Sequence, residues 1–345
     1  MTHMLREIHE QPEVLERLCE REYDNVCALW KAMQDRGIEQ ISIPARGTSD
    51  NAATFGKYLL EIVGGVVVSL AAPSVFTLYH AKLDLSKWLA VGISQSGEST
   101  DVIEVIRRAR EMGALTAGIT NVRDSTLARA VDFTLFCHAG EEKSIAATKT
   151  YTAALGLLYL LASVLARKPE MLGDLKSAAG AISSVFDIEG QIEGIVERYR
   201  YMEECVVIAR GLNHATCQEA ALKLSETCYV VAKPYSAADF LHGPIATIDE
   251  GFPVFLYAPP GRAYRPMLDL AEKLEEDSAE MIVISTDDEI LSRATTPVKL
   301  PVEVDEVYSP LVYVVVGQLF AQYLSVTKGY NPDEPRHLSK ITKTL

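Results

Sequence analysis

Residues 88–94 (WLAVGIS) and 115–120 (LTAGIT) are short apolar runs, and the segment between them, DVIEVIRRAREMG at 101–113, has a helical pattern. Three further short runs of this kind occur at 38–45 (IEQISIPA), 65–71 (GVVVSLA) and 131–136 (VDFTLF). Short apolar strands that alternate with longer helices are typical of a parallel sheet covered by helices on both faces. These residues therefore predict a doubly wound α/β domain.

The second half of the sequence repeats this pattern. Ala45-Arg46-Gly47 recurs as Ala209-Arg210-Gly211, which is 164 residues later, and residues 88–99 align with 252–263 at the same offset. Residues 115–120 align with 281–286 at an offset of 166, and the apolar segment after Thr148 has its counterpart at 311–326. Strands of α/β proteins resemble one another, but a nearly constant offset indicates duplication of the whole unit.

The predicted architecture is two tandem α/β domains, each a doubly wound, mainly parallel five-stranded sheet flanked by helices. A length of 345 residues is also typical of about two domains. The predicted parts are a helical lead-in at 1–35, a first domain at 36–170, a helical linker at 171–200, a second domain at 201–330, and a tail at 331–345.

Charge and cysteine content restrict the possible partners. The chain has 33 Lys and Arg against 47 Asp and Glu, a net charge of −14, which disfavours binding to nucleic acid. Its cysteines form no CxxC pair, and the isolated His214-x-x-Cys217 spacing lacks a second pair of zinc ligands. We therefore expect reduced thiols and no metal site. The six cysteines are Cys19, Cys27, Cys137, Cys205, Cys217 and Cys228.

No targeting or membrane segment is expected. The N-terminus, MTHMLREIHEQPEVLERL, is charged and has no apolar core like that of a signal peptide. The apolar run at 153–166 is shorter than the ~20 residues that a membrane-spanning helix requires. These features predict a cytoplasmic protein with no membrane partner.

Two predicted strand ends carry hydroxyl groups, at Gly47-Thr48-Ser49 and at residues 94–100, SQSGEST. In parallel sheets such ends, followed by helix N-termini, present backbone N–H groups to anions. A single hydroxyl before a helix is usually only an N-cap, but four in seven residues favour a phosphate loop that needs no basic side chain. The equivalent second-half segment, Ala258-Pro259-Pro260-Gly261, has no hydroxyls, which predicts one phosphate site per chain.

No nucleotide-binding motif accompanies this loop, because neither GxxxxGK[ST] nor a GxGxxG after the first strand is present. A phosphorylated sugar therefore fits better than ATP or NAD.

Candidate acid–base residues lie in the second half. Residues 214–228 have a helical pattern that places Glu219, Lys223 and Glu226 on one face, which is typical of a solvated, salt-bridged surface. His242 lies in a predicted loop before Gly-Pro, a position suited to proton transfer. The proline-rich, polar tail at 331–340 is on composition alone typical of a frayed terminus.

Six segments resemble, in the same order, the isomerase domain of glucosamine-fructose-6-phosphate aminotransferase. The resemblance extends over nearly the whole chain, and the opening MLREIHEQP is similar to the lead-in of that domain. The glutaminase domain of that family is not seen upstream, so we do not expect ammonia release from glutamine. The segments are GTS at 47–49, SQSGES at 94–99, ATKTYT at 147–152, EAALKLSE at 219–226, ADFLHGP at 238–244 and PRHLSK at 335–340.

The resemblance implies roles for individual residues. Ser94, Gln95, Ser96 and Ser99 would hold the 6-phosphate, with Ser99 in place of a family threonine, and Thr48 and Ser49 would line the sugar site. Ala147 lies where the family commonly has serine and therefore lacks a sugar-contacting hydroxyl.

The resemblance also implies the chemistry. Glu226 would move a proton between C1 and C2 of the open sugar, assisted by Lys223. His242 would open the ring from the neighbouring subunit of a homodimer. Lys340 would form a Schiff base or stabilise the open-chain form. No metal or organic cofactor is expected.

The expected activity is that of a phosphosugar isomerase/deaminase related to stand-alone glucosamine-6-phosphate deaminases, which convert glucosamine 6-phosphate to fructose 6-phosphate and ammonia. One alternative is a deglycase or isomerase that acts on a phosphorylated fructosamine. Another is a non-catalytic sugar-phosphate sensor. The sensor is disfavoured because no helix-turn-helix is recognisable and because Glu226, His242 and Lys340 are all present.

Overall fold

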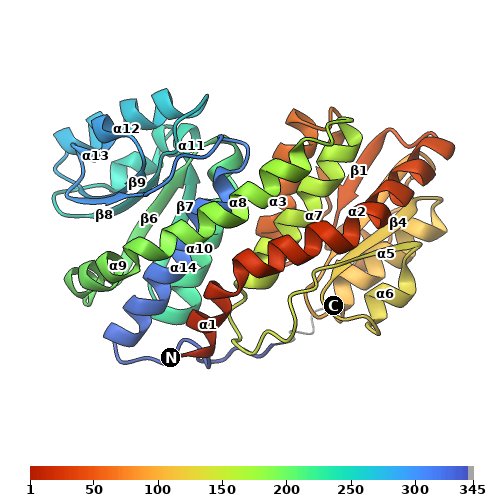
Figure 1. The fold of residues 1–345 in the computed structure, drawn as a ribbon, viewed down its shortest axis with the longest axis horizontal. Coiled ribbons are helices and arrows are strands. Elements are labelled where there is room, and N and C mark those ends of the chain that lie inside the picture. The colour runs from red at the N-terminus through yellow and green to blue at the C-terminus, as the bar shows by residue number, and fades with distance from the viewer. Residues whose placement is uncertain (341–345) are drawn as a thin grey trace. The chain divides into compact units, whose positions relative to one another are not determined.

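The computed structural model describes residues 1–340, and the chain divides into two compact units (Figure 1). The N-terminal unit comprises residues 10–142 and 147–179 together with 338–340 of the tail. The C-terminal unit comprises residues 1–9, 143–146 and 180–337. Residues 341–345 of the predicted tail lie outside the described residues.

The N-terminal unit is built on a parallel five-stranded sheet in the order β2-β1-β3-β4-β5. The strands are β1 (Gln40–Ile43), β2 (Val67–Leu70), β3 (Trp88–Ile93), β4 (Leu115–Thr120) and β5 (Phe133–Phe136). All six residues of β4 are buried, as expected for a strand covered on both faces. The accompanying helices are α2 (Gln11–Asp35), α3 (Thr48–Ile62), α4 (Pro73–Thr77), α5 (Thr100–Glu111), α6 (Thr126–Ala130) and α7 (Lys149–Leu165).

The C-terminal unit repeats this topology with the order β10-β9-β8-β6-β7, again all parallel. The strands are β6 (Glu204–Ala209), β7 (Val231–Ser236), β8 (Pro253–Tyr257), β9 (Glu280–Ser285) and β10 (Thr296–Lys299). The prediction of two five-stranded, helix-flanked α/β sheets is therefore confirmed. The helices of this unit include α1 (His3–His9), α9 (Glu189–Ile195), α10 (His214–Cys228), α11 (Ala237–Leu241), α12 (Tyr264–Glu276), α13 (Asp288–Leu291) and α14 (Ser309–Thr327).

Helix α8 (Met171–Val185) and the 3₁₀ turns η1 (Phe186–Ile188) and η2 (Val196–Tyr199) lie between the two sheets in the sequence. Two further 3₁₀ turns, η3 (Gly211–Asn213) and η4 (Pro244–Thr247), precede α10 and follow α11.

Each unit has an apolar central helix. In the N-terminal unit α7 packs against α2 and α3, and in the C-terminal unit α14 packs against α10 and α9. Among the described residues, α14 is the one helix whose length and composition would allow it to cross a membrane, but 83% of its apolar window is buried inside the protein. At 19 residues it is longer than the apolar run at 153–166. Its burial is that of a core helix.

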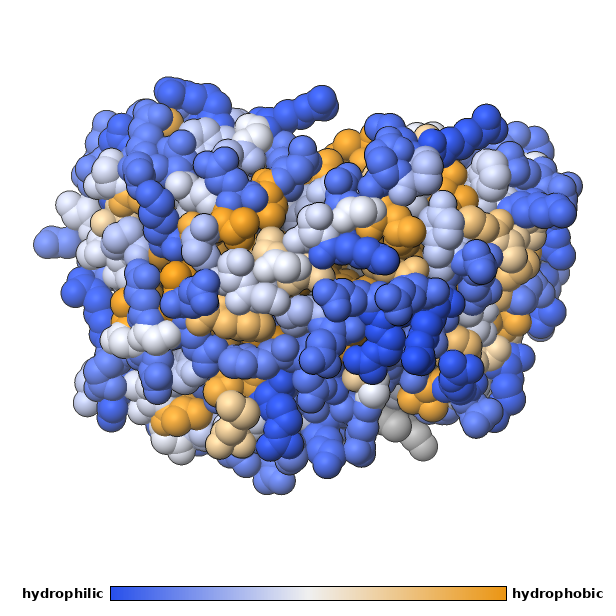
Figure 2. Space-filling model, viewed as in Figure 1, coloured by the Kyte–Doolittle hydropathy of each residue, from blue (hydrophilic) through white to orange (hydrophobic). Residues whose placement is uncertain are grey.

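The surface is mainly polar. On the face shown in Figure 2, hydrophilic residues cover most of the area and hydrophobic residues form small separate groups.

All six cysteines are free, and five of them are buried. Burial raises the pKa of Cys217 and of Cys228 to about 12, so both remain thiols at neutral pH. Within residues 1–340, no cluster of His, Cys, Asp or Glu is placed to hold a metal ion.

Candidate active site

A hydroxyl-rich loop follows the third strand of the N-terminal unit. Strand β3 ends at Ile93, and residues 94–100 lead into α5, whose N-cap is Ser99. Gly97 has a φ of +66°, and a Cβ atom there would lie 2.2 Å from the Oγ of Ser125, so only glycine fits. The loop ends at the positive end of a 12-residue helix. Its hydroxyls and the helix end together suit a phosphate group.

A small cavity opens beside this loop and brings four of the predicted residues together. Its volume is ≈ 80 Å³, well below the ~300–1,000 Å³ of pockets that hold complete ligands. The cavity can therefore hold only one end of a sugar phosphate and not the whole molecule. Ser94, Ser96 and Ser99 lie in the same loop but are not among the residues that line the cavity. The four predicted residues that line it are Thr48, Ser49, Gln95 and Ala147.

Arg46 also lines this cavity, which the sequence analysis did not anticipate. Its Nε lies 2.5 Å from Oδ2 of Asp101, whose side chain is almost completely buried at the start of α5. Asp101 also accepts a hydrogen bond from the Ser99 hydroxyl at 3.1 Å. A basic side chain is therefore part of the cavity, although the loop pattern alone suggested that none is needed. The sequence signal for this residue was its position in the repeated Ala-Arg-Gly segment, directly after the first strand.

A cysteine in the cavity wall is not a nucleophile at neutral pH. Cys137 lines the cavity and is buried. Burial, reinforced by the negative charges of Glu142 and Glu22, raises the pKa of its thiol far above neutrality. Cys137 therefore acts as an apolar wall.

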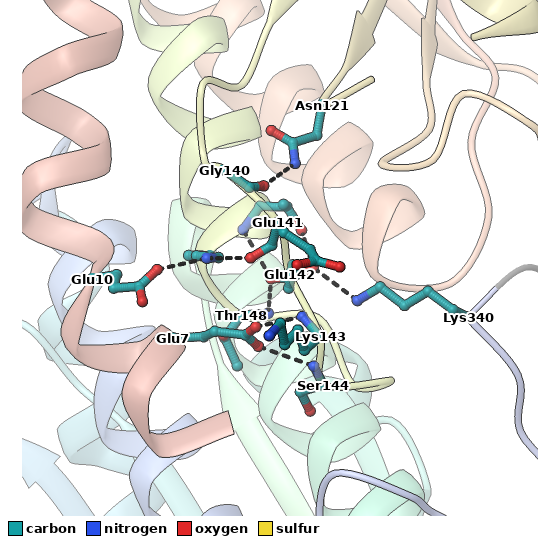
Figure 3. A network of polar contacts seen from close by, with 12 residues as sticks. Glu7, Glu10, Asn121, Gly140, Glu141, Glu142, Lys143, Ser144, Thr148 and Lys340 are labelled. Carbon is teal, nitrogen blue, oxygen red and sulfur yellow. Dashed lines mark hydrogen bonds and ion pairs between the residues drawn. The ribbon is translucent and has the colours of Figure 1, made fainter. Parts of the chain in front are cut away.

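Lys340 is held by a buried carboxylate that the sequence analysis did not identify. The Nζ of Lys340 lies 3.1 Å from Oε2 of Glu142, whose side chain is fully buried (Figure 3). Glu142 also accepts hydrogen bonds from the N–H groups of Thr148 at 2.9 Å and Thr150 at 3.2 Å, and from the Thr150 hydroxyl at 2.7 Å. These contacts fix the position of the carboxylate. Nothing in the sequence distinguished Glu142 from the exposed Glu141 beside it.

The tail before Lys340 is also anchored, within the C-terminal unit. The carboxylate of Asp333 accepts the N–H groups of His3 at 2.8 Å and Met4 at 2.7 Å, at the start of α1. The guanidinium of Arg336 lies 4.4 Å from the ring centre of Tyr229. The composition-based expectation of a frayed terminus is therefore wrong for residues 333–336, because their side chains have partners far away in the sequence.

Helix α10 of the C-terminal unit carries a lysine between two glutamates. Lys223 is fully buried, its Nζ lies 3.4 Å from Oε1 of Glu219, and it donates a short hydrogen bond to Glu226. Glu219 is also fully buried, whereas the side chain of Glu226 is 23% exposed. The expectation of a solvated face is therefore wrong for Glu219 and Lys223, because β6, β7 and α14 pack around this helix.

The charge state of Lys223 follows from these contacts. Burial on its own lowers the pKa of a lysine, but the attraction of Glu219 and Glu226 outweighs it, and the net shift is upward. Lys223 is therefore a permanent cation at neutral pH. Its ammonium group contacts the carboxylate of Glu226, which remains partly accessible.

His242 is exposed and follows α11 directly, with its backbone N–H donating to the carbonyl of Asp239 at 3.1 Å. Like Lys223 and Glu226 it belongs to the C-terminal unit, whereas the hydroxyl-rich loop, the cavity and Lys340 belong to the N-terminal unit.

The second-half counterpart of the phosphate loop is filled by the chain itself. The loop lies between β8 and α12, and the carboxylate of Glu306 accepts the N–H groups of Arg262 at 2.7 Å and Ala263 at 3.0 Å. A Cβ atom at Gly261 would lie 2.5 Å from Oε2 of Glu306. An internal anion therefore occupies the place that a ligand anion would need.

Comparisons with known proteins agree with this architecture. Residues 36–164 and 202–328 match the sequence family described as the SIS domain. The chain is 34% identical over 351 residues to glutamine–fructose-6-phosphate aminotransferase (isomerizing) of Thermus thermophilus. That match covers 98% of this chain and 58% of the Thermus protein. The chain spans 56–58% of the length of the curated aminotransferases that it matches, which is less than two thirds.

Solved structures give the same result. A protein of Silicibacter pomeroyi, provisionally assigned as a phosphosugar isomerase, is 31% identical with a TM-score of 0.84, covering 96% of this chain and 100% of that one. Glucosamine-6-phosphate deaminase of Thermotoga maritima has a TM-score of 0.82 at 23% identity, covering 99% of this chain and 100% of that one. At that identity the likeness establishes the fold alone.

Proposed function

The chain belongs to the SIS domain family, and we propose that it is a phosphosugar isomerase that converts glucosamine 6-phosphate and water to fructose 6-phosphate and ammonia. The observation that carries the proposal is the pair on α10, in which the buried cation Lys223 holds the partly exposed carboxylate of Glu226. A carboxylate of this kind can remove a proton from carbon only if it stays ionised and reachable. The cation of Lys223 lies against this carboxylate, and the exposure of Glu226 leaves it reachable.

Binding is assigned to the hydroxyl-rich loop. The 6-phosphate is held by Ser94, Gln95, Ser96 and Ser99 at the N-terminus of α5, and Arg46 in the adjoining cavity adds a positive charge. Thr48 and Ser49 contact the sugar. The side chain of Ala147 contributes a methyl group where a hydroxyl would otherwise contact the sugar.

The reaction is assigned to Glu226, His242 and Lys340. His242, from the second subunit of a homodimer, opens the ring to the 2-amino aldehyde. Glu226 takes the proton from C2 and returns it to C1, while the carbonyl oxygen at C1 gains a proton and the nitrogen at C2 loses one, which gives a 1-hydroxy 2-imine. Water adds to C2 and ammonia leaves, so that fructose 6-phosphate results and all atoms balance. Lys340, held by Glu142, stabilises the open-chain carbonyl.

A second candidate is a deglycase that acts on a phosphorylated fructosamine. Ala147 favours it, because a methyl group in the cavity wall removes a hydroxyl contact and leaves space near the sugar. The same loop and the same base would act in this reaction. A sensor without catalysis is the third possibility, and the assay below separates it from both enzymes.

The test measures ammonia and fructose 6-phosphate in parallel, with glucosamine 6-phosphate and a phosphorylated fructosamine offered separately. Equal amounts of ammonia and fructose 6-phosphate from glucosamine 6-phosphate support the proposal. Turnover of the fructosamine alone transfers the assignment to a deglycase. Binding of glucosamine 6-phosphate with no product from either compound contradicts both enzymes and supports the sensor. We further propose that the enzyme acts in the cytoplasm.

A further inference from the structure

Helices α5 and α6 of the N-terminal unit pack against each other (Figure 1). Side chains of these two helices line a second hollow. Its volume is ≈ 410 Å³, which lies within the ~300–1,000 Å³ of small-molecule pockets. It shares no lining residue with the cavity beside the hydroxyl-rich loop. We call it the arginine hollow, and its polar lining residues are Arg107, Arg110, Glu111, Thr126 and Arg129.

The charge of the arginine hollow is opposite to that of the chain. Three arginines and one glutamate line it, in a protein of net charge −14. Within residues 1–340, Arg107 and Arg129 form no ion pair, although carboxylates outnumber basic groups. Arg110 is held in place by Asp132, with Nη2 2.8 Å from Oδ1. Arg107 and Arg129, which have no carboxylate partner, therefore line the same concave surface as Arg110, which Asp132 holds in place.

Guanidinium groups recognise phosphate and carboxylate oxygens through paired N–H donors. Because Asp132 offsets Arg110, the two remaining arginines against Glu111 leave an excess of one positive charge, while all three guanidinium groups offer N–H donors. The volume also exceeds what a single inorganic phosphate requires. We propose that the arginine hollow binds a small molecule that carries at least two phosphate groups.

The arginine hollow is connected to the hydroxyl-rich loop. The backbone N–H and the hydroxyl of Thr126 both donate to the carboxylate of Glu98, at 2.8 and 2.7 Å. The N–H of Leu127 donates to the carbonyl of Gly97 at 2.9 Å. Gly97 and Glu98 lie in the loop that would hold the sugar phosphate. Occupancy of the hollow therefore changes how the loop holds its ligand, an effect that rests on the proposed function of the loop.

The binding test uses pyrophosphate and ADP as probes in isothermal titration calorimetry. Because either probe can enter the hydroxyl-rich loop, glucosamine 6-phosphate is present at saturation, with the Glu226→Gln protein used to prevent turnover. The double variant Arg107→Ala/Arg129→Ala is compared with Arg21→Ala/Arg36→Ala, which loses two exposed arginines from α2 and its C-cap and so has the same net charge.

We expect both probes to bind, and the hollow variant to bind about tenfold more weakly or worse, since charge-assisted hydrogen bonds are lost. The control variant should stay within about twofold, because surface charges this far apart are screened. Equal affinity for pyrophosphate and ADP assigns recognition to the phosphates alone, and tighter ADP binding adds a nucleoside contact. No binding of either probe, or equal loss in both variants, overturns the proposal.

The connection to the loop is tested in the same protein. Glucosamine 6-phosphate is titrated with and without saturating pyrophosphate, and a change in its affinity of about fivefold or more is expected for coupled sites. An unchanged affinity overturns the coupling. If glucosamine 6-phosphate does not bind at all, the proposed function of the loop fails. In that case the binding test is repeated without sugar phosphate on a protein that carries Ser96→Ala and Ser99→Ala. It then shows whether the arginine hollow binds the probes.

Discussion

The loops that follow β3 and β8 occupy equivalent places in the two halves, but different side chains lie against them. Each precedes a helix, α5 or α12, and each contains a glycine with positive φ whose position has no room for a Cβ atom. In the first half, Gly97 packs against Ser125 and the loop presents hydroxyls. In the second half, Gly261 packs against Glu306, which accepts two backbone N–H groups. The same backbone arrangement therefore holds an internal carboxylate in the second half, and we propose that it holds a ligand anion in the first.

The helices that follow the first strand of each half, α3 and α10, each carry a lysine–glutamate pair, but the two pairs differ in burial. On α3 the pair Lys57–Glu61 lies at the surface, with both side chains more than a third exposed. On α10 Lys223 is fully buried between Glu219 and Glu226. A surface pair of this kind contributes ~0.3–0.5 kcal/mol, whereas removal of one partner from a buried pair costs ~3–5 kcal/mol. The charged pair is thus a surface feature in the first half and a buried feature in the second.

The largest expected effect is on turnover. Glu226→Gln keeps the shape of the side chain but removes the base, so kcat should fall by about 10²–10⁴-fold. Affinity for glucosamine 6-phosphate should change by less than about threefold, since the phosphate loop is untouched. Steady-state kinetics and calorimetry measure the two quantities. The exposed Glu276→Gln is the control, and a Glu226→Gln enzyme with normal kcat would assign the base to another residue.

The next effect is on stability and compares the two lysines. Lys223→Met leaves the buried carboxylate of Glu219 without its cation and should lower the free energy of unfolding by ~3–5 kcal/mol. Lys57→Met should lower it by ~0.5 kcal/mol or less. Urea unfolding followed by circular dichroism measures both. Similar losses for the two variants would contradict the contrast between buried and surface pairs.

A smaller effect is expected on binding. Ser96→Ala/Ser99→Ala removes two hydroxyls from the first loop and should weaken glucosamine 6-phosphate binding by about tenfold to a hundredfold, because hydrogen bonds to a charged group are lost. Pro259→Ala/Pro260→Ala in the second loop is the matched change, and it should leave affinity unaltered. The comparison of the halves fails if the proline variant weakens binding as much as the serine variant.

The smallest effect concerns the tail. Glu142→Gln replaces the carboxylate that holds Lys340 with an amide, which should lower kcat by about tenfold and cost ~1–3 kcal/mol of stability. Hydrogen exchange at residues 335–340 should rise in the variant, a change that a purely structural role in the core would not produce. The adjacent, exposed Glu141→Gln should behave like the wild type. Unchanged exchange in Glu142→Gln would show that this carboxylate does not position the tail.

The sequence predicted most of the fold because strands and helices are local patterns. The run at 115–120 became a strand with every residue buried, and the helix at 214–228 has the predicted bounds. The partners of Lys340, Asp333 and Arg262 were not predicted, because each contact joins residues distant in the sequence. Helical periodicity also could not show that Lys223 is buried, since burial depends on the strands and helix that pack around α10.

The most direct test of one phosphate site per chain is the stoichiometry of glucosamine 6-phosphate binding. The Glu226→Gln protein is titrated by calorimetry, so that the ligand is not consumed, alone and with Glu306→Gln added. We predict one ligand per chain in both cases, with binding lost when Ser96→Ala and Ser99→Ala are introduced. Two ligands per chain, or binding that survives in the serine variant and is lost in Glu306→Gln, would contradict the assignment of the phosphate to the first half.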